Sequence, residues 1–157
     1  MVPLVLSAAL SAVSVALRAY KLVEARSDLS SAGMLAMETL GQDLRGMCEV
    51  YDDSSGTHLR GRLQDNTTDV AYDFTPPSGS LSGTVLRNGK DLFGSDTSVT
   101  SCEFVYLAPG PDPDDPLQED PSCEVSPQNA SSVRVRLVIA RGSTSMTFES
   151  VFDLRNL

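Results

Sequence analysis

Two regions with different patterns of hydrophobic and polar positions divide the chain. Residues 1–17 contain no charged side chain, whereas the remainder is polar, acidic and rich in turn residues. Beyond residue 17, apolar residues continue at helical spacing as far as Met47. We therefore expect one continuous helix of about 45 residues. At about 1.5 Å per residue it would be roughly 65 Å long, which is more than a small domain can cover.

The first half of this helix, residues 1–20, is expected to be its membrane-spanning or filament-core part. Small residues alternate with Leu and Val there, a mixture that permits close approach of helices in lipid or in a bundle. The uncharged run is slightly shorter than the roughly 20 apolar residues of a spanning helix. A plain single-pass anchor without lateral contacts is the alternative. The side chains expected to make the contacts are Leu4, Val5, Leu6, Ala9, Leu10, Val13 and Leu17.

The second half, residues 21–48, is amphipathic and is expected to lie under a sheet. Gly33 and Gly41 lower helix propensity, so they predict either close contact with the overlying sheet or a bend. The positions expected on the buried face are Leu22, Leu29, Met37, Leu40, Leu44 and Met47.

Residues 49–157 change to short alternating segments separated by turns, which is typical of β-strands. Asn88-Gly89 is a strong hairpin signal, and residues 108–132 are expected to form a loop. Together these features predict an α+β fold, with a long N-terminal helix packed on a mostly antiparallel sheet and a globular head over residues 21–157. The predicted strands are residues 70–74, 83–87, 91–93, 102–107, 133–139 and 146–152.

The net charge of −9 and the pI near 4.4 argue against direct binding of nucleic acid, because an acidic surface repels phosphates. The chain contains three cysteines. Cys102 and Cys123 would close a loop of about 20 residues if an oxidising compartment allowed a disulfide. The alternative is that all three thiols are free, and Cys48 has no obvious partner in either case.

No motif points to catalysis. His58 is the only histidine and has no nucleophile motif near it, so neither an enzyme nor a cofactor is expected. Asp112, Asp114 and Asp115 form a weak calcium candidate, since clustered carboxylates suit this ion. Their spacing does not match an EF-hand, and a solvated loop is the favoured interpretation. No other metal site is expected.

Five segments, in this order, resemble the type IV pilin superfamily. Within it they are most similar to the minor-pilin and pseudopilin branch, which includes the PilW-type pilins and the J-type pseudopilins of type II secretion. The segments are MVPLVLSAAL at residues 1–10, LGQDLR at 40–45, LRNG at 86–89, VTSCEFVY at 99–106 and FESVFDLRN at 148–156.

The resemblance implies assembly rather than catalysis. It implies a minor pilin that primes a type IV pilus or joins its tip complex, or alternatively a pseudopilin at the tip of a secretion pseudopilus. The implied partners are other major and minor pilins or pseudopilins, contacted through the N-terminal helix. The implied location is the bacterial inner membrane before assembly, and the periplasm or cell surface afterwards. A membrane-anchored binding domain or adhesin that never polymerises is an alternative of another class.

The chain departs from the family pattern at its start. Family members begin with a basic leader, a glycine before the cleavage site and an apolar motif containing a glutamate, and residues 1–10 show none of these. Met1-Val2-Pro3-Leu4 is similar to the sequence that follows this glutamate. We therefore expect the natural start to lie upstream; about six more residues would complete a full span.

Overall fold

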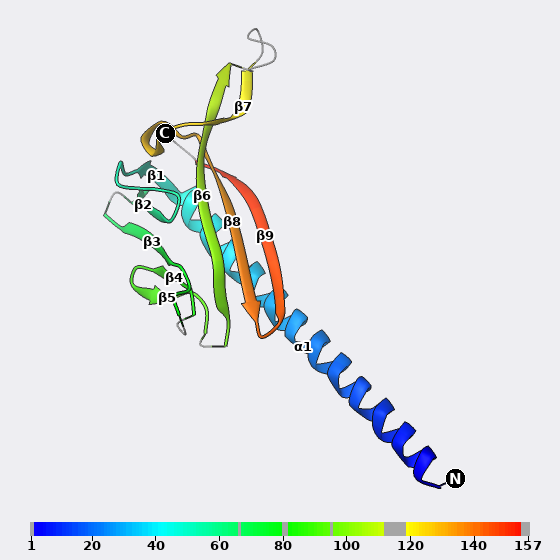
Figure 1. The fold of residues 1–157 in the computed structure, drawn as a ribbon. Coiled ribbons are helices and arrows are strands. Elements are labelled where there is room, and N and C mark those ends of the chain that lie inside the picture. The colour runs from blue at the N-terminus through cyan, green and yellow to red at the C-terminus, as the bar shows by residue number, and fades with distance from the viewer. Residues whose placement is uncertain (1, 66, 80–81, 95, 112–118, 155–157) are drawn as a thin grey trace.

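The computed structural model describes residues 2–65, 67–79, 82–94, 96–111 and 119–154, and describes no side chains for residues 2–9, 110–111 and 119–122. A long helix comes first and strands follow (Figure 1). The elements are α1 (Val2–Gly46), β1 (Met47–Val50), β2 (His58–Leu63), β3 (Asp69–Thr75), β4 (Thr84–Arg87), β5 (Lys90–Asp91), β6 (Ser98–Pro111), β7 (Glu119–Glu124), η1 (Pro127–Asn129), β8 (Ser132–Arg141) and β9 (Thr144–Asp153).

The strands form two antiparallel sheets, which confirms the α+β prediction. One sheet has the order β1-β2-β3-β4-β5 and the other has the order β7-β6-β8-β9. Every strand pairing among the described residues is antiparallel. The loops also join the sheets, since the Val99 amide donates to the Gly83 carbonyl and the Phe104 amide to the Gly56 carbonyl.

Helix α1 runs without interruption over 45 residues, as predicted. Arg45 lies in its last turn, where a positive charge is favourable beside the unpaired carbonyl groups. The N-terminal half of α1 projects away from the head, whereas the C-terminal half runs behind β8 and β9 (Figure 1). The two halves of one helix therefore have different surroundings.

The two helix glycines mark close approach, which was one of the two outcomes predicted for them. A Cβ atom added at Gly33 would lie 2.2 Å from the Phe148 ring, and one added at Gly41 would lie 2.5 Å from the Phe152 ring. Both aromatic residues belong to β9. The guanidinium group of Arg45 lies 5.6 Å from the centre of the Phe152 ring. The absence of a side chain at Gly33 and Gly41 thus brings the edge strand against α1.

A single hydrophobic core includes residues of α1 and of both sheets. Strand β8 shows why, because its alternate residues are buried from Val133 to Ile139. Tyr72 of β3 and Phe104 of β6 are the largest fully buried side chains. The β8 residues that enter the core are Val133, Val135, Leu137 and Ile139, which are the four that the alternation placed on one face.

The Asn88-Gly89 hairpin has the predicted geometry. Asn88 has φ 50° and Gly89 has φ 75°, as a two-residue turn of the mirror-image type requires. The turn joins β4 to β5, and the Asn88 Oδ1 accepts a 2.7 Å hydrogen bond from the Ala71 amide of β3. The Asn side chain therefore also joins the turn to the neighbouring strand.

Four strands differ from the prediction. Strands β1 and β2 were not predicted, and residues 108–132 were predicted to form a loop. Strand β6 instead continues to Pro111 and pairs with β7. In β2 the apolar face is interrupted at Gly61, which takes a buried position where the Glu49 carbonyl approaches closely, whereas Arg60 and Arg62 lie on the outer face of the sheet.

Candidate assembly surface

The projecting half of α1 exposes an apolar surface. Leu10 is 64% exposed, Val13 57%, Val15 64% and Leu17 57%, and no residue from 11 to 23 is buried. Ser14 does not need water as a partner, because its hydroxyl donates a 2.8 Å hydrogen bond to the Ser11 carbonyl one turn earlier. The surface is therefore less polar than its serine content indicates.

Of the residues predicted for the filament core, Leu10, Val13 and Leu17 lie on this exposed surface. The side chains of Leu4, Val5, Leu6 and Ala9 lie outside the described part of the chain. Within the part that is described, no helix is both long enough and apolar enough to cross a membrane.

The predicted buried face of the second half divides into correct and incorrect positions. Leu29, Leu40 and Leu44 are fully buried, and Met37 packs against the core. The assignment of Leu22 is wrong, because it is 45% exposed. The β8–β9 turn ends near Asp28, which pairs with Arg141, so the sheet does not extend as far as Leu22.

Met47 needs a different correction. It is fully buried, but it is the first residue of β1 and not part of α1. The chain leaves the helix at Gly46, where glycine has low helix propensity. Met47 therefore enters the core from the sheet, opposite Leu63 of β2.

A buried polar contact that was not predicted joins α1 to the five-stranded sheet. The side chain of Asp43 is 10% exposed, and its two oxygens accept hydrogen bonds from Arg87 at 2.7 and 2.9 Å. The Tyr72 hydroxyl donates to the same carboxylate at 2.6 Å. Burial and this carboxylate raise the pKa of Tyr72, and the hydrogen bond to Asp43 raises the pKa of Arg87. The sequence signal for this contact was the position of Asp43, an acidic residue three positions after the core residue Leu40.

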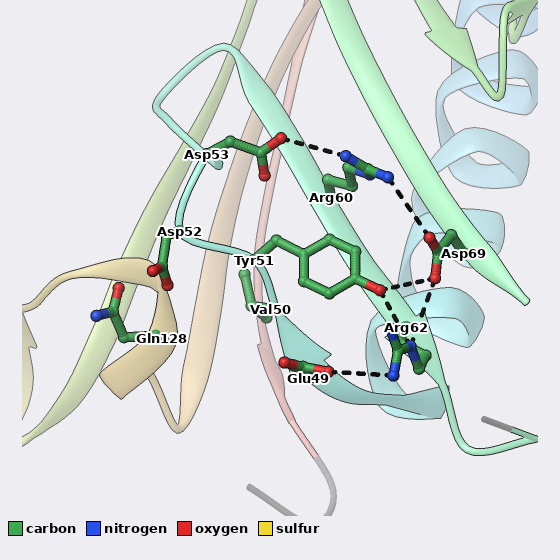
Figure 2. Close-up of a pocket in the computed structure, with 9 residues that line it drawn as sticks. All are labelled: Glu49, Val50, Tyr51, Asp52, Asp53, Arg60, Arg62, Asp69 and Gln128. Carbon is green, nitrogen blue, oxygen red and sulfur yellow. Dashed lines mark hydrogen bonds and ion pairs between the residues drawn. The ribbon is translucent and has the colours of Figure 1, made fainter. Parts of the chain in front are cut away.

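A polar hollow of about 670 Å³ opens between β1, β2 and η1 (Figure 2). Tyr51 lies at its centre, with the guanidinium groups of Arg60 and Arg62 5.0 and 5.7 Å from its ring centre. The Tyr51 hydroxyl donates to Asp69 at 2.8 Å and accepts from Arg62 at 3.0 Å. The hydrogen bond to Asp69 raises the pKa of Tyr51. Both arginines are thus already paired, Arg60 with Asp53 and Asp69 and Arg62 with Glu49 and Asp69.

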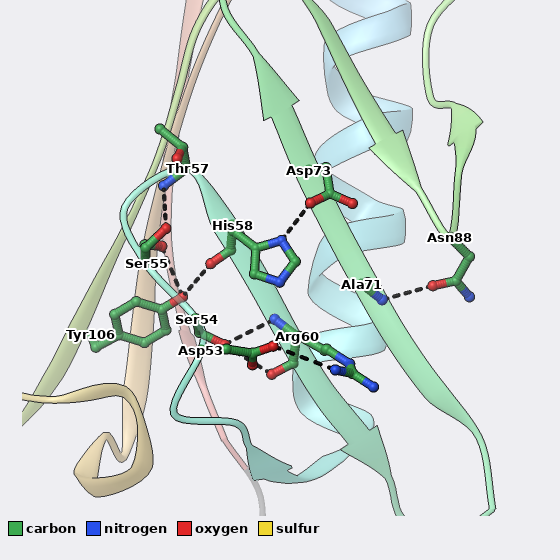
Figure 3. A network of polar contacts seen from close by, with 10 residues as sticks. All are labelled: Asp53, Ser54, Ser55, Thr57, His58, Arg60, Ala71, Asp73, Asn88 and Tyr106. Atoms are coloured by element: carbon green, nitrogen blue, oxygen red, sulfur yellow. Dashed lines mark hydrogen bonds and ion pairs between the residues drawn. The ribbon is translucent and has the colours of Figure 1, made fainter.

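His58 lies in a second polar network on the same sheet (Figure 3). Its Nδ1 lies 2.5 Å from Asp73, its partner across the β2–β3 ladder. The buried Ser54 hydroxyl exchanges hydrogen bonds with the backbone of Arg60. The Tyr106 hydroxyl lies 3.1 Å from the Ser55 carbonyl oxygen and 3.2 Å from that of His58. These contacts fix the β1–β2 loop against β6.

The predicted disulfide between Cys102 and Cys123 is not formed, because Cys102 is a thiol. Cys102 pairs with Leu137, whereas Cys123 lies opposite Ala108, about six residues further along β6. Six strand residues span roughly 20 Å, far beyond the reach of a disulfide. Burial raises the pKa of the Cys102 thiol to about 12. Cys48 is half-buried, and its thiol donates to the Leu63 carbonyl at 3.5 Å.

The calcium candidate Asp112, Asp114 and Asp115 lies outside the described residues. In the described ranges, no group of three or more His, Cys, Asp or Glu side chains could hold a metal ion.

Seven of the ten large hydrophobic side chains that are exposed among the described residues lie between Leu10 and Val23 of α1. The sequence matches no protein-family model, and comparison with curated proteins and with solved structures likewise gives no match.

Proposed function

We propose that the chain is a structural subunit of a type IV pilus-like filament, a minor pilin that primes assembly or takes part in the tip complex. The observation that supports this most strongly is the exposed, uncharged half of α1, continuous with a half that is built into the head. Exposed apolar surface of this extent marks an interaction site.

Helix–helix packing between subunits would bury this surface. Each Leu or Val that becomes fully buried contributes about 1.5–3 kcal/mol, and several lie along the projecting half. Alanine and serine between them allow neighbouring helices to approach closely. The sequence resemblance to minor pilins and pseudopilins adds the class of partner, which is another subunit with a similar helix.

The contact between head and helix suits such a role. Gly33, Gly41 and the Asp43–Arg87 pair join the second half of α1 to both sheets. The helix therefore serves as a rigid stem that carries the head, so the position of the stem in a filament also fixes the position of the head. The same proposal includes storage of the subunit in the inner membrane before assembly.

The test is photo-crosslinking through a benzophenone amino acid placed at Val13 in the full chain, produced in its native cells. We expect crosslinks to the N-terminal helices of pilin-like subunits, identified by mass spectrometry. The matched control carries the probe at Ser27, an exposed position of α1 that lies nearer the head.

A monomer that crosslinks to no protein at Val13, or crosslinks equally at Ser27 and Val13, would contradict the proposal. In the first case, the remaining function is that of an anchored binding domain that never polymerises.

A further inference from the structure

Strand β9 forms one edge of the four-stranded sheet (Figure 1). All of its residues pair with β8 in one continuous register without a bulge. Edge strands in natural proteins are usually short, or are protected by a bulge, by proline or by charged residues, most often lysine. Residues 144–153 contain neither proline nor lysine, and their only charged side chains are Glu149 and Asp153. This edge therefore lacks the usual protection against a further strand, except against one that is itself acidic.

The turn before β9 determines which backbone groups face outward. Arg141 pairs with Thr144 across a two-residue turn in which Gly142 has φ 59°. The pair that closes such a turn exchanges both hydrogen bonds, and bonded and non-bonded pairs alternate from there. At the other end, the Leu154 amide donates to the Ser131 carbonyl, which agrees with this alternation. The residues that direct their N–H and C=O groups away from β8 are therefore Ser145, Thr147, Glu149, Val151 and Asp153.

The outward-facing groups of this edge are available to a partner. Within the described part of the chain, no backbone hydrogen bond reaches them. The side chains of the same five residues are all exposed. A strand added at this edge would therefore meet unpaired backbone groups and exposed side chains together.

Charge alternates across the exposed face of the sheet towards this edge. Glu103 of β6 lies opposite Arg136 of β8, and Arg136 lies opposite Glu149 of β9. Neither Glu149 nor Asp153 forms an ion pair with any described residue. Opposite charges directly across a strand pair are stabilising, and like charges are destabilising. The next strand in this row is therefore favoured if it presents lysine or arginine opposite both acids.

Apolar side chains flank the same edge on both faces of the sheet. Val151 is 52% exposed on the outer face. On the other face, Gly33 of α1 faces Phe148, whereas Ala32 faces the segment after β5. Successive helix residues are rotated by about 100°, so Met34 lies on the side of β9 that is away from the five-stranded sheet. Met34 is 64% exposed there, which gives an added strand an apolar contact on this face as well.

We propose that the outer edge of β9 binds an extended segment of another protein by strand addition. The segment carries lysine or arginine at two positions, i and i+4, opposite Asp153 and Glu149, and an apolar residue midway between them, opposite Val151. In this mode of recognition the backbone hydrogen bonds supply the affinity and alternate side chains supply the specificity. A second copy of β9 is a poor occupant, because it would bring two more acids to an acidic edge. The proposal goes beyond the filament role and does not require the first half of α1.

The first test measures binding of a basic heptapeptide to the full chain in detergent by fluorescence anisotropy. The probe is fluorescein-labelled Lys-Val-Val-Thr-Lys-Val-Thr with an amidated C-terminus, and we expect saturable binding. The control peptide has glutamate in place of both lysines. It should bind at least about tenfold more weakly, because both cross-strand charge pairs become repulsive. Equal binding of the two peptides, or binding of neither, would overturn the proposal.

The second test reverses the charge of the edge. In the double variant Glu149→Lys, Asp153→Lys both changes are at exposed positions, so the fold should be retained. We expect the acidic peptide to bind this variant more tightly than the basic peptide does, which is the opposite of the order for the unmodified chain. If the basic peptide remains the tighter ligand, it binds elsewhere and the edge assignment is wrong.

The third test asks whether the backbone of the edge makes the contact. Val151→Pro removes an outward-facing N–H at an edge position, where a sheet tolerates proline. It should weaken binding of the basic peptide about tenfold or more, whereas Val151→Thr, which keeps the N–H, should change it less than about threefold. Slow alkylation of the buried Cys102 thiol checks that both variants are folded. Equal binding by the two folded variants would contradict strand addition.

Amide hydrogen exchange of the unmodified ¹⁵N-labelled chain gives a readout that needs no substitution. The basic peptide should slow exchange of the Thr147, Glu149 and Val151 amides at least about tenfold, and should leave the Phe148 and Ser150 amides, which already bond β8, nearly unchanged. Binding without this alternating protection would overturn the proposal. Protection that rises with the concentration of the chain alone, and that the peptide does not alter, would assign the edge to a second copy instead.

The outcomes are independent of the filament proposal. If Val13 crosslinks to other helices but the basic peptide does not bind β9, the edge assignment is wrong and the filament proposal stands. If the peptide binds with alternating protection but Val13 captures no partner, the edge assignment stands alone.

Discussion

The two halves of α1 have the same backbone conformation and opposite surroundings. In the second half, Leu29, Leu40 and Leu44 are fully buried against the sheets, whereas in the first half Leu10 and Leu17 remain exposed. Helix propensity does not explain the difference, since both halves contain alanine and leucine and the covered half carries the unfavourable Gly33 and Gly41. The difference shows that the head stabilises only the part of the helix that it covers, and leaves the rest available for a partner.

The largest effect is expected for the reactivity of the Cys102 thiol in the folded chain compared with the unfolded chain. Cys102 lies on the sheet that covers the second half of α1. Burial raises its pKa from 9.0 to about 12, so its thiolate fraction at pH 8 falls about a thousandfold. Alkylation by iodoacetamide, followed by mass spectrometry, should be slower by at least this factor than in the chain unfolded in urea.

The pH dependence follows from the same shift. Because the unfolded thiol ionises near pH 9 and the folded thiol near pH 12, the unfolded chain binds fewer protons in this window. The free energy of unfolding should therefore fall as the pH rises above about 9.

In the alkylation experiment, Leu17→Asp is the control and should leave the protection of Cys102 unchanged. Alkylation at the rate of the unfolded chain would contradict the burial of this thiol.

Matched truncations compare the two halves directly. Leu40→Ala should lower the free energy of unfolding by about 2–5 kcal/mol, because it leaves a cavity in the core. Leu17→Ala should change it by less than about 0.5 kcal/mol, because its side chain is exposed in the isolated subunit. Urea unfolding followed by circular dichroism measures both. Equal losses would show that the first half is covered by its own chain.

The Asp43 contact tests how the covered half is held. Asp43→Ala leaves the Tyr72 hydroxyl and the Arg87 guanidinium without their partner, which should cost about 1–3 kcal/mol of unfolding free energy. The cost stays below that of a fully buried pair because the Arg87 side chain is 40% exposed. Asp43→Asn, which keeps the shape of the side chain, is the control and should lose less. A loss below about 0.5 kcal/mol for Asp43→Ala would contradict a stabilising role.

The smallest effect is expected where the covered half ends. Asp28→Ala removes an exposed ion pair with Arg141, and Arg141 retains Asp96 at 3.7 Å. The loss should be about 0–1 kcal/mol and should decrease further in 0.5 M salt. Thermal unfolding at two salt concentrations measures it. A loss as large as that of Asp43→Ala would show that this end of the sheet is held more tightly than its exposure indicates.

Much of the fold could be predicted from local patterns. The helix, the Asn88-Gly89 turn and the buried face of β8 follow from periodicity and turn chemistry, which act over a few residues. Strand β2 was missed because Gly61 takes the place of an apolar residue on its buried face, where the Glu49 carbonyl of β1 approaches closely, a contact that the local pattern does not contain. Leu22 was assigned to the buried face because helical spacing shows which side of a helix is apolar and not how far a sheet extends along it.

The sequence by itself determined that one long helix has an uncharged half and an amphipathic half, because charge and periodicity are properties of neighbouring residues. Only the tertiary structure decided where the covered part ends, which partners Asp43 finds, and that Cys102 and Cys123 lie too far apart for a disulfide. It also decided that β9 lies at an edge of its sheet. These features depend on strand register and on contacts between distant segments, which no local pattern specifies.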